Sequence, residues 1–97
     1  MKRDPWIETL LELRRQHIDQ IRSFHSDESN SLATVNRIYR LEVAELAYPL
    51  AYAQRVSEHI YEIKRLGLER VQRYQTLKRH QSEEIYNLMR DKPVTGQ

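Results

Sequence analysis

Apolar residues in the C-terminal two thirds of the chain recur with helical spacing. When each residue is rotated by 100° from the one before it, the main apolar side chains from 32 to 90 fall within about 60° of one line. A step of eleven residues, about 3.67 residues per turn, recurs in this segment and keeps the stripe on one side of a nearly straight helix. The residues at this step are Leu41, Tyr52, Ile63, Tyr74 and Ile85. The pattern predicts a long amphipathic helix over 32–90.

A shorter helix is predicted near the N-terminus, over 5–24. Asp4 can cap the free N–H groups of a first turn, and Pro5 suits the first helical position because its missing N–H would have no partner there. The segment carries its own apolar stripe, made of Ile7, Leu10, Leu11, Ile18 and Ile21. This helix therefore needs a partner surface as well.

The polar run Ser26–Ser31 separates the two predicted helices. It contains no apolar residue, and several of its side chains can bond their own backbone, so we predict a loop at 25–31 and an antiparallel hairpin around it. In that hairpin Arg14 would pair with Glu42 or Glu45. The short helix would reach only the first third of the long one, whose remainder would extend as an arm.

Two residues could interrupt the long helix. Pro49 lacks a backbone donor and crowds the preceding turn, whereas Gly67 weakens a helix by roughly 1 kcal/mol relative to Ala. Neither lies in a polar segment, so the prediction is a continuous helix with kinks at Pro49 or Gly67. We expect 1–91 to form a single helical domain and 92–97, which contains Pro93 and Gly96, to form a short flexible tail.

Composition supports an all-α class. The 97 residues are 39% hydrophobic and 31% charged, with Gly 2 and Pro 3, which is too little turn chemistry for a β fold. The chain contains no Cys, its N-terminus does not have the apolar core of a secretory signal, and no uncharged run approaches the roughly 18 residues of a membrane span. We expect a cytoplasmic protein that does not bind membranes.

Candidate chemistry is sparse. The four histidines, His17, His25, His59 and His80, do not occur in a Glu-x-x-His spacing typical of helical metal sites. The chain also lacks a glycine-rich phosphate loop and a nucleophile elbow. We therefore expect no catalytic, cofactor or metal site, no small-molecule substrate and no enzymatic activity.

The predicted arm indicates a helical interaction protein, such as an adaptor, an inhibitor or an assembly subunit. Its apolar stripe would be stranded unless a protein partner or a second copy of the chain covered it, as in a straight or slightly right-handed coiled coil. The residues expected at that interface are Val56, Ile60, Ile63, Val71, Tyr74, Leu77, Ile85 and Leu88.

A nucleic-acid-binding helix is the alternative function. In the segment 64–80 only Glu69 opposes six positive charges, and such charges could contact phosphates. The six residues are Lys64, Arg65, Arg70, Arg73, Lys78 and Arg79. On a helical wheel they spread around most of the circumference, whereas a groove-binding helix gathers its positive charge on one face. Protein docking is therefore favoured, and the alternative stays open.

Overall fold

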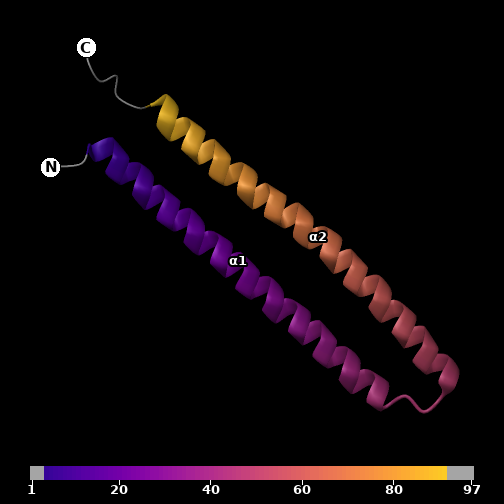
Figure 1. Ribbon diagram of the computed structural model, residues 1–97. Helices are drawn as coiled ribbons and strands as arrows, with labels where there is room; N and C mark the ends of the chain where they lie inside the picture. Colours follow the sequence, from indigo (N-terminus) through magenta and orange to yellow (C-terminus); the bar gives the residue numbers. More distant parts are fainter. Residues whose placement is uncertain (1–3, 92–97) are drawn as a thin grey trace.

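The computed structural model describes residues 4–91, which form two long antiparallel helices (Figure 1). Helix α1 spans Pro5–Ala44 with 40 residues, and α2 spans Pro49–Arg90 with 42 residues. The molecule is a narrow rod of 78 × 21 × 11 Å. The expected all-α class is confirmed. The residues predicted to form the tail, 92–97, lie outside the described part of the chain.

The predicted division into a short helix, a loop and a long kinked helix is wrong. Residues 25–31 are helical and lie inside α1, and the chain reverses at 45–48 instead. Ser, Asp and Asn lower helix propensity by only a few tenths of a kcal/mol each, so a polar run does not by itself end a helix. The hairpin therefore folds about its middle, and the two helices are nearly equal in length.

Pro49 separates the two helices rather than bending one. It occupies the first turn of α2, where a missing N–H has no consequence. The residue before a proline is pushed out of the helical region, and Tyr48 is accordingly extended at φ −101° and ψ 129°. The reversal includes the apolar residues Leu46, Ala47 and Tyr48, which is why no polar segment marked it. Gly67 produces no break and lies inside α2.

The start of α1 follows the sequence prediction. The Asp4 side chain accepts a hydrogen bond of 2.9 Å from the Trp6 backbone N–H, and Pro5 begins the helix. At its other end, the Glu45 N–H donates to the Glu42 carbonyl at 3.1 Å in a tightened last turn. Capping thus fixes the first residue of α1, and the reversal fixes its last.

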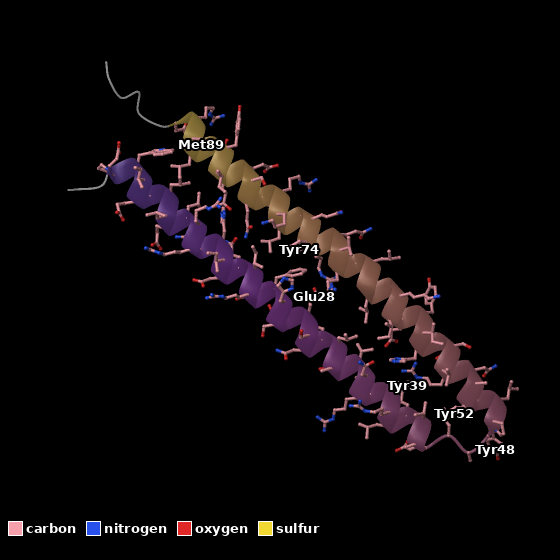
Figure 2. The ribbon with its side chains drawn as sticks, viewed as in Figure 1. Glu28, Tyr39, Tyr48, Tyr52, Tyr74 and Met89 are labelled. Carbon is pink, nitrogen blue, oxygen red and sulfur yellow. The ribbon has the colours of Figure 1, made fainter. Side chains whose placement is uncertain are left out.

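Only the α2 part of the eleven-residue step faces α1, because Ile63, Tyr74 and Ile85 are half-buried whereas Leu41 and Tyr52 are 60% and 48% exposed. The Phe24 and Tyr74 ring centroids are 5.6 Å apart, and Tyr39 stacks on His59 with centroids 3.8 Å apart. Phe24 and Tyr39 are as far apart in the sequence as His59 and Tyr74. The antiparallel register is therefore the same at both ring contacts. Figure 2 shows Tyr74 and Tyr39 on the facing sides of α2 and α1.

The contact between the helices lacks an apolar core. Among the described residues no hydrophobic side chain is buried, and the only two buried residues are polar, His17 at 5% and Gln81 at 3% exposure. Two helices packed side by side can cover each other along one strip only, so apolar positions on either flank of that strip stay half-exposed. The hairpin is a single layer of two helices.

Candidate protein-interaction surface

A polar layer of His17 and Gln81 joins the two helices. Gln81 Nε2 donates hydrogen bonds to the His17 carbonyl at 3.0 Å and to Gln20 Oε1 at 3.1 Å. The His17 ring is almost covered, and its Nε2 lies 3.4 Å from Glu84 Oε1 without forming a hydrogen bond. The layer fixes the relative position of the helices because Gln81 can reach these acceptors at one register only.

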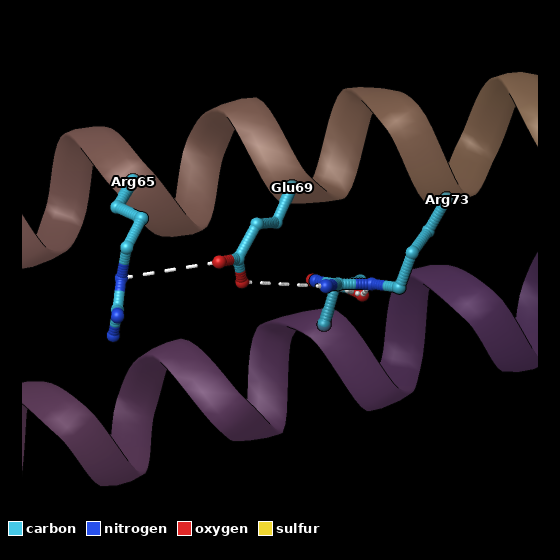
Figure 3. A network of polar contacts seen from close by, with 4 residues as sticks. Arg65, Glu69 and Arg73 are labelled. Atoms are coloured by element: carbon cyan, nitrogen blue, oxygen red, sulfur yellow. Dashed lines mark hydrogen bonds and ion pairs between the residues drawn. The ribbon is translucent and has the colours of Figure 1, made fainter.

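A second polar layer lies at the middle of the rod and centres on Glu28. Arg73 donates from Nε and Nη2 to the two Glu28 oxygens, both at 2.8 Å, which is a bidentate pair. These hydrogen bonds hold the pKa of the Glu28 carboxyl below its ordinary value of 4.5. Arg73 also lies 3.7 Å from Glu69, which lies 3.9 Å from Arg65 (Figure 3). Part of the polar run predicted as a loop is thus an anchor between the helices.

A third layer lies near the reversal. Arg55 Nε donates to Glu42 Oε2 at 2.6 Å, and its guanidinium carbon is 5.4 Å from the centre of the Tyr39 ring that stacks on His59. The hydrogen bond to Glu42 raises the pKa of Arg55. The predicted pairing of Arg14 with Glu42 or Glu45 is wrong, because in the observed register Arg14 lies beside Lys78 instead.

One broad side of the hairpin carries three shallow grooves with acidic rims. Their α1 residues recur after eleven residues from the first groove to the second and after twenty-two from the second to the third, which is three and six helical turns, so all three grooves open on the same side. The grooves hold Glu8, Glu12 and Glu84 around Leu13 and Leu88; Asp19, Asp27 and Glu28 around Phe24 and Leu77; and Glu42, Glu45 and Glu58 around Leu46 and Ala51. We call this side the acidic face.

The cations of the acidic face are neutralised within it. Each groove contains one arginine, and each arginine lies beside a carboxylate of the same groove. Arg15 is 3.5 Å from Glu12, Arg73 is 2.7 Å from Glu28, and Arg55 is 2.6 Å from Glu42. With three acidic residues and one arginine in each groove, each of the three grooves carries a net negative charge.

The opposite side of the hairpin carries apolar and basic side chains. A further groove opens there between Arg14 and Ile18 of α1 and Lys78 and Ser82 of α2, on the other flank of each helix from Glu12 and Glu84. Exposed apolar and basic side chains continue along this flank at helical spacing. They are Ile7, Arg14, Ile18 and Arg40 of α1, and Ile60, Lys64, Val71, Lys78 and Met89 of α2. We call this side the apolar–basic face; within α1 and α2 no Asp or Glu lies on it.

The structure divides the predicted interface residues into two groups. Ile60 and Val71 are 50% and 51% exposed on the apolar–basic face. The other six, Val56, Ile63, Tyr74, Leu77, Ile85 and Leu88, are half-buried. Tyr74 contacts Phe24, and Leu77, Ile85 and Leu88 line grooves together with α1 residues. The premise of an uncovered arm is therefore wrong, and contact of these residues with a second polypeptide stays a prediction.

The six residues predicted to contact phosphates do not form one patch. Lys64 and Lys78 lie on the apolar–basic face, whereas Arg73 and Arg65 lie beside the carboxylates of Glu28 and Glu69 on the acidic face. Arg70 lines the space between the helices next to Gly67 and contributes to lowering the pKa of Glu28. Arg79 is exposed on the outer side of α2. Binding of nucleic acid by 64–80 stays a prediction.

The opposed charges of the two faces were missed in the sequence, where positive and negative residues alternate. The signal was the helical position of the charged residues, because the groove carboxylates lie on one flank of each helix whereas Arg14 and Lys78 lie on the other. Using this signal needed the correct reversal point, and the polar run at Ser26–Ser31 pointed to the wrong one.

Residues 4–91 contain no group of three His, Cys, Asp or Glu side chains able to hold a metal ion. None of the helices in the same range is long and apolar enough to cross a membrane. Comparison with known protein families, known proteins and solved structures finds no match to this chain.

Proposed function

We propose that this protein is a non-enzymatic helical interaction protein, an adaptor, inhibitor or assembly subunit, that docks onto a protein partner or onto its own copy. The observation that supports the proposal is the absence of buried hydrophobic side chains among the described residues. Burial of apolar surface is the main favourable term in folding. A hairpin whose apolar side chains all stay partly exposed to water would therefore be stabilised by a further layer of polypeptide packed against it.

The size of the exposed surface supports the same proposal. The chain exposes 8143 Å², whereas a compact protein of its mass would expose about 5,900 Å². Its radius of gyration is 22.2 Å, against about 12.5 Å for a compact chain of this length. The difference of roughly 2,200 Å² is comparable to the surface that obligate complexes bury.

The apolar–basic face is the best candidate for docking. It combines Ile60 and Val71 with other exposed apolar side chains, and side chains of this kind contribute most when a partner removes them from water. Nucleic-acid binding has less support, because two of the six candidate cations lie within ion-pair distance of carboxylates. Phosphate contacts would have to compete with those pairs.

The proposal can be tested by affinity capture with three tagged baits from extracts of the source cells. One bait is the wild-type chain, the second carries Ile60→Glu and Val71→Glu, and the third carries Tyr61→Glu and Gln72→Glu, which are also exposed. The third is a matched control because these two residues have the same spacing and charge change but lie on the outer side of α2. All baits should keep the same helicity by circular dichroism.

We expect the wild-type and control baits to retain the same protein, which can be an untagged copy of this chain, and the Ile60/Val71 bait to lose at least nine tenths of it. The proposal is contradicted if the three baits retain the same set of proteins in equal amounts.

A further inference from the structure

The two broad faces of the hairpin complement each other. The acidic face presents grooves with apolar floors and carboxylate rims, such as the groove over Phe24 and Leu77 between Asp19 and Asp27. The apolar–basic face presents exposed apolar side chains between cations, such as Ile18 beside Arg14 and Lys78. Each face therefore has the charge and the apolar chemistry that the other would bind.

We propose that copies of this chain stack face to back, with the apolar–basic face of one copy on the acidic face of the next. The inference rests on the proposed function, since it names the partner as a second copy. In the stack Ile18, Ile60 and Val71 would enter the grooves, and the cations beside them would pair with the carboxylate rims. Such a contact is heterologous, so each copy uses both faces and the assembly can grow beyond a dimer.

Charge disfavours the symmetric alternative. A two-fold dimer through the apolar–basic face would bring Arg14, Lys64 and Lys78 of both copies into one interface that contains no helical Asp or Glu. Like charges in an interface oppose association and suppress that partner. A two-fold dimer through the acidic face would gather carboxylates in the same way. Face-to-back contact is the arrangement that pairs the charges.

The available area is sufficient for stacking. Shared between two faces, the roughly 2,200 Å² of surplus surface gives about 1,100 Å² per face, and a standard interface buries about 800 Å² per partner. Exposed apolar side chains contribute on one side of this contact, with Ile18 at 49%, Ile60 at 50% and Val71 at 51% exposure. The apolar groove floors contribute on the other.

Two charge-reversal variants test the stacking. The acid-reversed variant carries Glu12→Lys, Asp27→Lys and Glu58→Lys, one change in each groove of the acidic face. The base-reversed variant carries Arg14→Glu, Lys64→Glu and Lys78→Glu on the opposite face. All six residues are exposed, so the helical signal in circular dichroism should be unchanged. Sedimentation velocity then measures the size of each variant, alone and mixed, over a range of protein concentrations.

We expect the wild-type chain to grow beyond a dimer with rising concentration. Its apparent association constant should fall at least tenfold between about 50 mM and 500 mM salt, because salt screens charges in contact with water. Each variant alone should be monomeric, because the reversals remove the charge attraction between its faces. In the acid-reversed variant the six remaining groove carboxylates are balanced by six cations, and in the base-reversed variant three carboxylates replace three cations. An equimolar mixture should assemble again, because the basic faces of one variant match the acidic faces of the other.

Three results would overturn the stacking. A wild-type chain that is monomeric at all concentrations excludes it. A dimer that does not grow and survives in the acid-reversed variant indicates a two-fold contact through the apolar–basic face. Two monomeric variants that stay monomeric when mixed show that charge pairing between faces is not the cause of assembly.

Binding of a monomeric wild-type chain to vesicles of phosphatidylserine or to a DNA duplex, lost only in the base-reversed variant, would assign the apolar–basic face to a polyanion and also overturn the stacking. The proposed function fails separately, only when the capture experiment shows no protein lost from the Ile60/Val71 bait.

Discussion

Gln81 Nε2 donates a 3.0 Å hydrogen bond to the backbone carbonyl of His17, and these two are the most covered residues of the described chain. The best-covered point of the hairpin is therefore polar. A buried polar layer is costly when one partner is lost but can be replaced by apolar residues when both are changed together.

We expect Gln81→Leu alone to lower the free energy of unfolding by about 1–2 kcal/mol, because the hydrogen bonds to the His17 carbonyl and to Gln20 Oε1 are lost while the covered His17 Nε2 stays without a hydrogen-bond partner among the described residues. The double variant His17→Leu/Gln81→Leu should regain that loss or exceed the wild-type stability. Urea denaturation at one fixed protein concentration measures both. A double variant less stable than Gln81→Leu would show that the polar layer contributes to the unfolding free energy of the hairpin, and not only to the relative position of its helices.

The Glu28 and Arg73 pair makes stability depend on pH. Because the folded pKa of Glu28 lies below its ordinary value of 4.5, the pair stabilises the fold above that pH. The contribution is lost as the pH falls through the lower, folded pKa, where the carboxylate is protonated in both states. We expect wild type to be more stable than Glu28→Gln at pH 6, and the difference between them to shrink as the pH falls below 4.5.

The matched control for that comparison is Glu83→Gln, since Glu83 is exposed and forms no ion pair with another residue of 4–91. Its unfolding free energy should run parallel to that of wild type over the same pH range. A constant difference between wild type and Glu28→Gln from pH 6 to pH 3 would contradict the role assigned to the pair.

Substitutions at Ser29 distinguish a helix from a loop at 25–31. Ser29 is exposed within α1, so Ser29→Pro should cost about 3 kcal/mol or more, because it removes a helical hydrogen bond and clashes with the preceding turn. Ser29→Ala should stabilise by a few tenths of a kcal/mol through helix propensity. Thermal unfolding followed at 222 nm measures both, and tolerance of the proline would indicate a loop after all.

Gly67 offers a simple gain in stability. A Cβ built there meets nothing within 4 Å, and the residue lies in the interior of α2. We expect Gly67→Ala to raise the free energy of unfolding by about 0.5–1 kcal/mol, since glycine loses more backbone entropy in a helix than alanine does. The melting temperature measures the change. A destabilised variant would mean that a second chain approaches closely at this glycine.

The sequence by itself determined the class and the local elements of this protein. The amphipathic spacing and the low content of Gly and Pro predicted an all-α chain, and Asp4 with Pro5 predicted the first residue of α1, because capping depends on neighbouring residues alone. The eleven-residue step through Tyr52, Ile63 and Tyr74 is also local, since it reflects three helical turns.

Only the tertiary structure decided where the chain reverses. Ser26–Ser31 and Pro49 were both compatible with a break, and their local preferences differ by no more than a few kcal/mol. Pairing between the helices selects between them, because reversal at 45–48 lets two helices of nearly equal length pack along each other. The contacts of Phe24 with Tyr74 and of Glu28 with Arg73 belong to this pairing. The two opposed faces follow from that choice, because which flanks of α1 and α2 share a side depends on how the chain folds back.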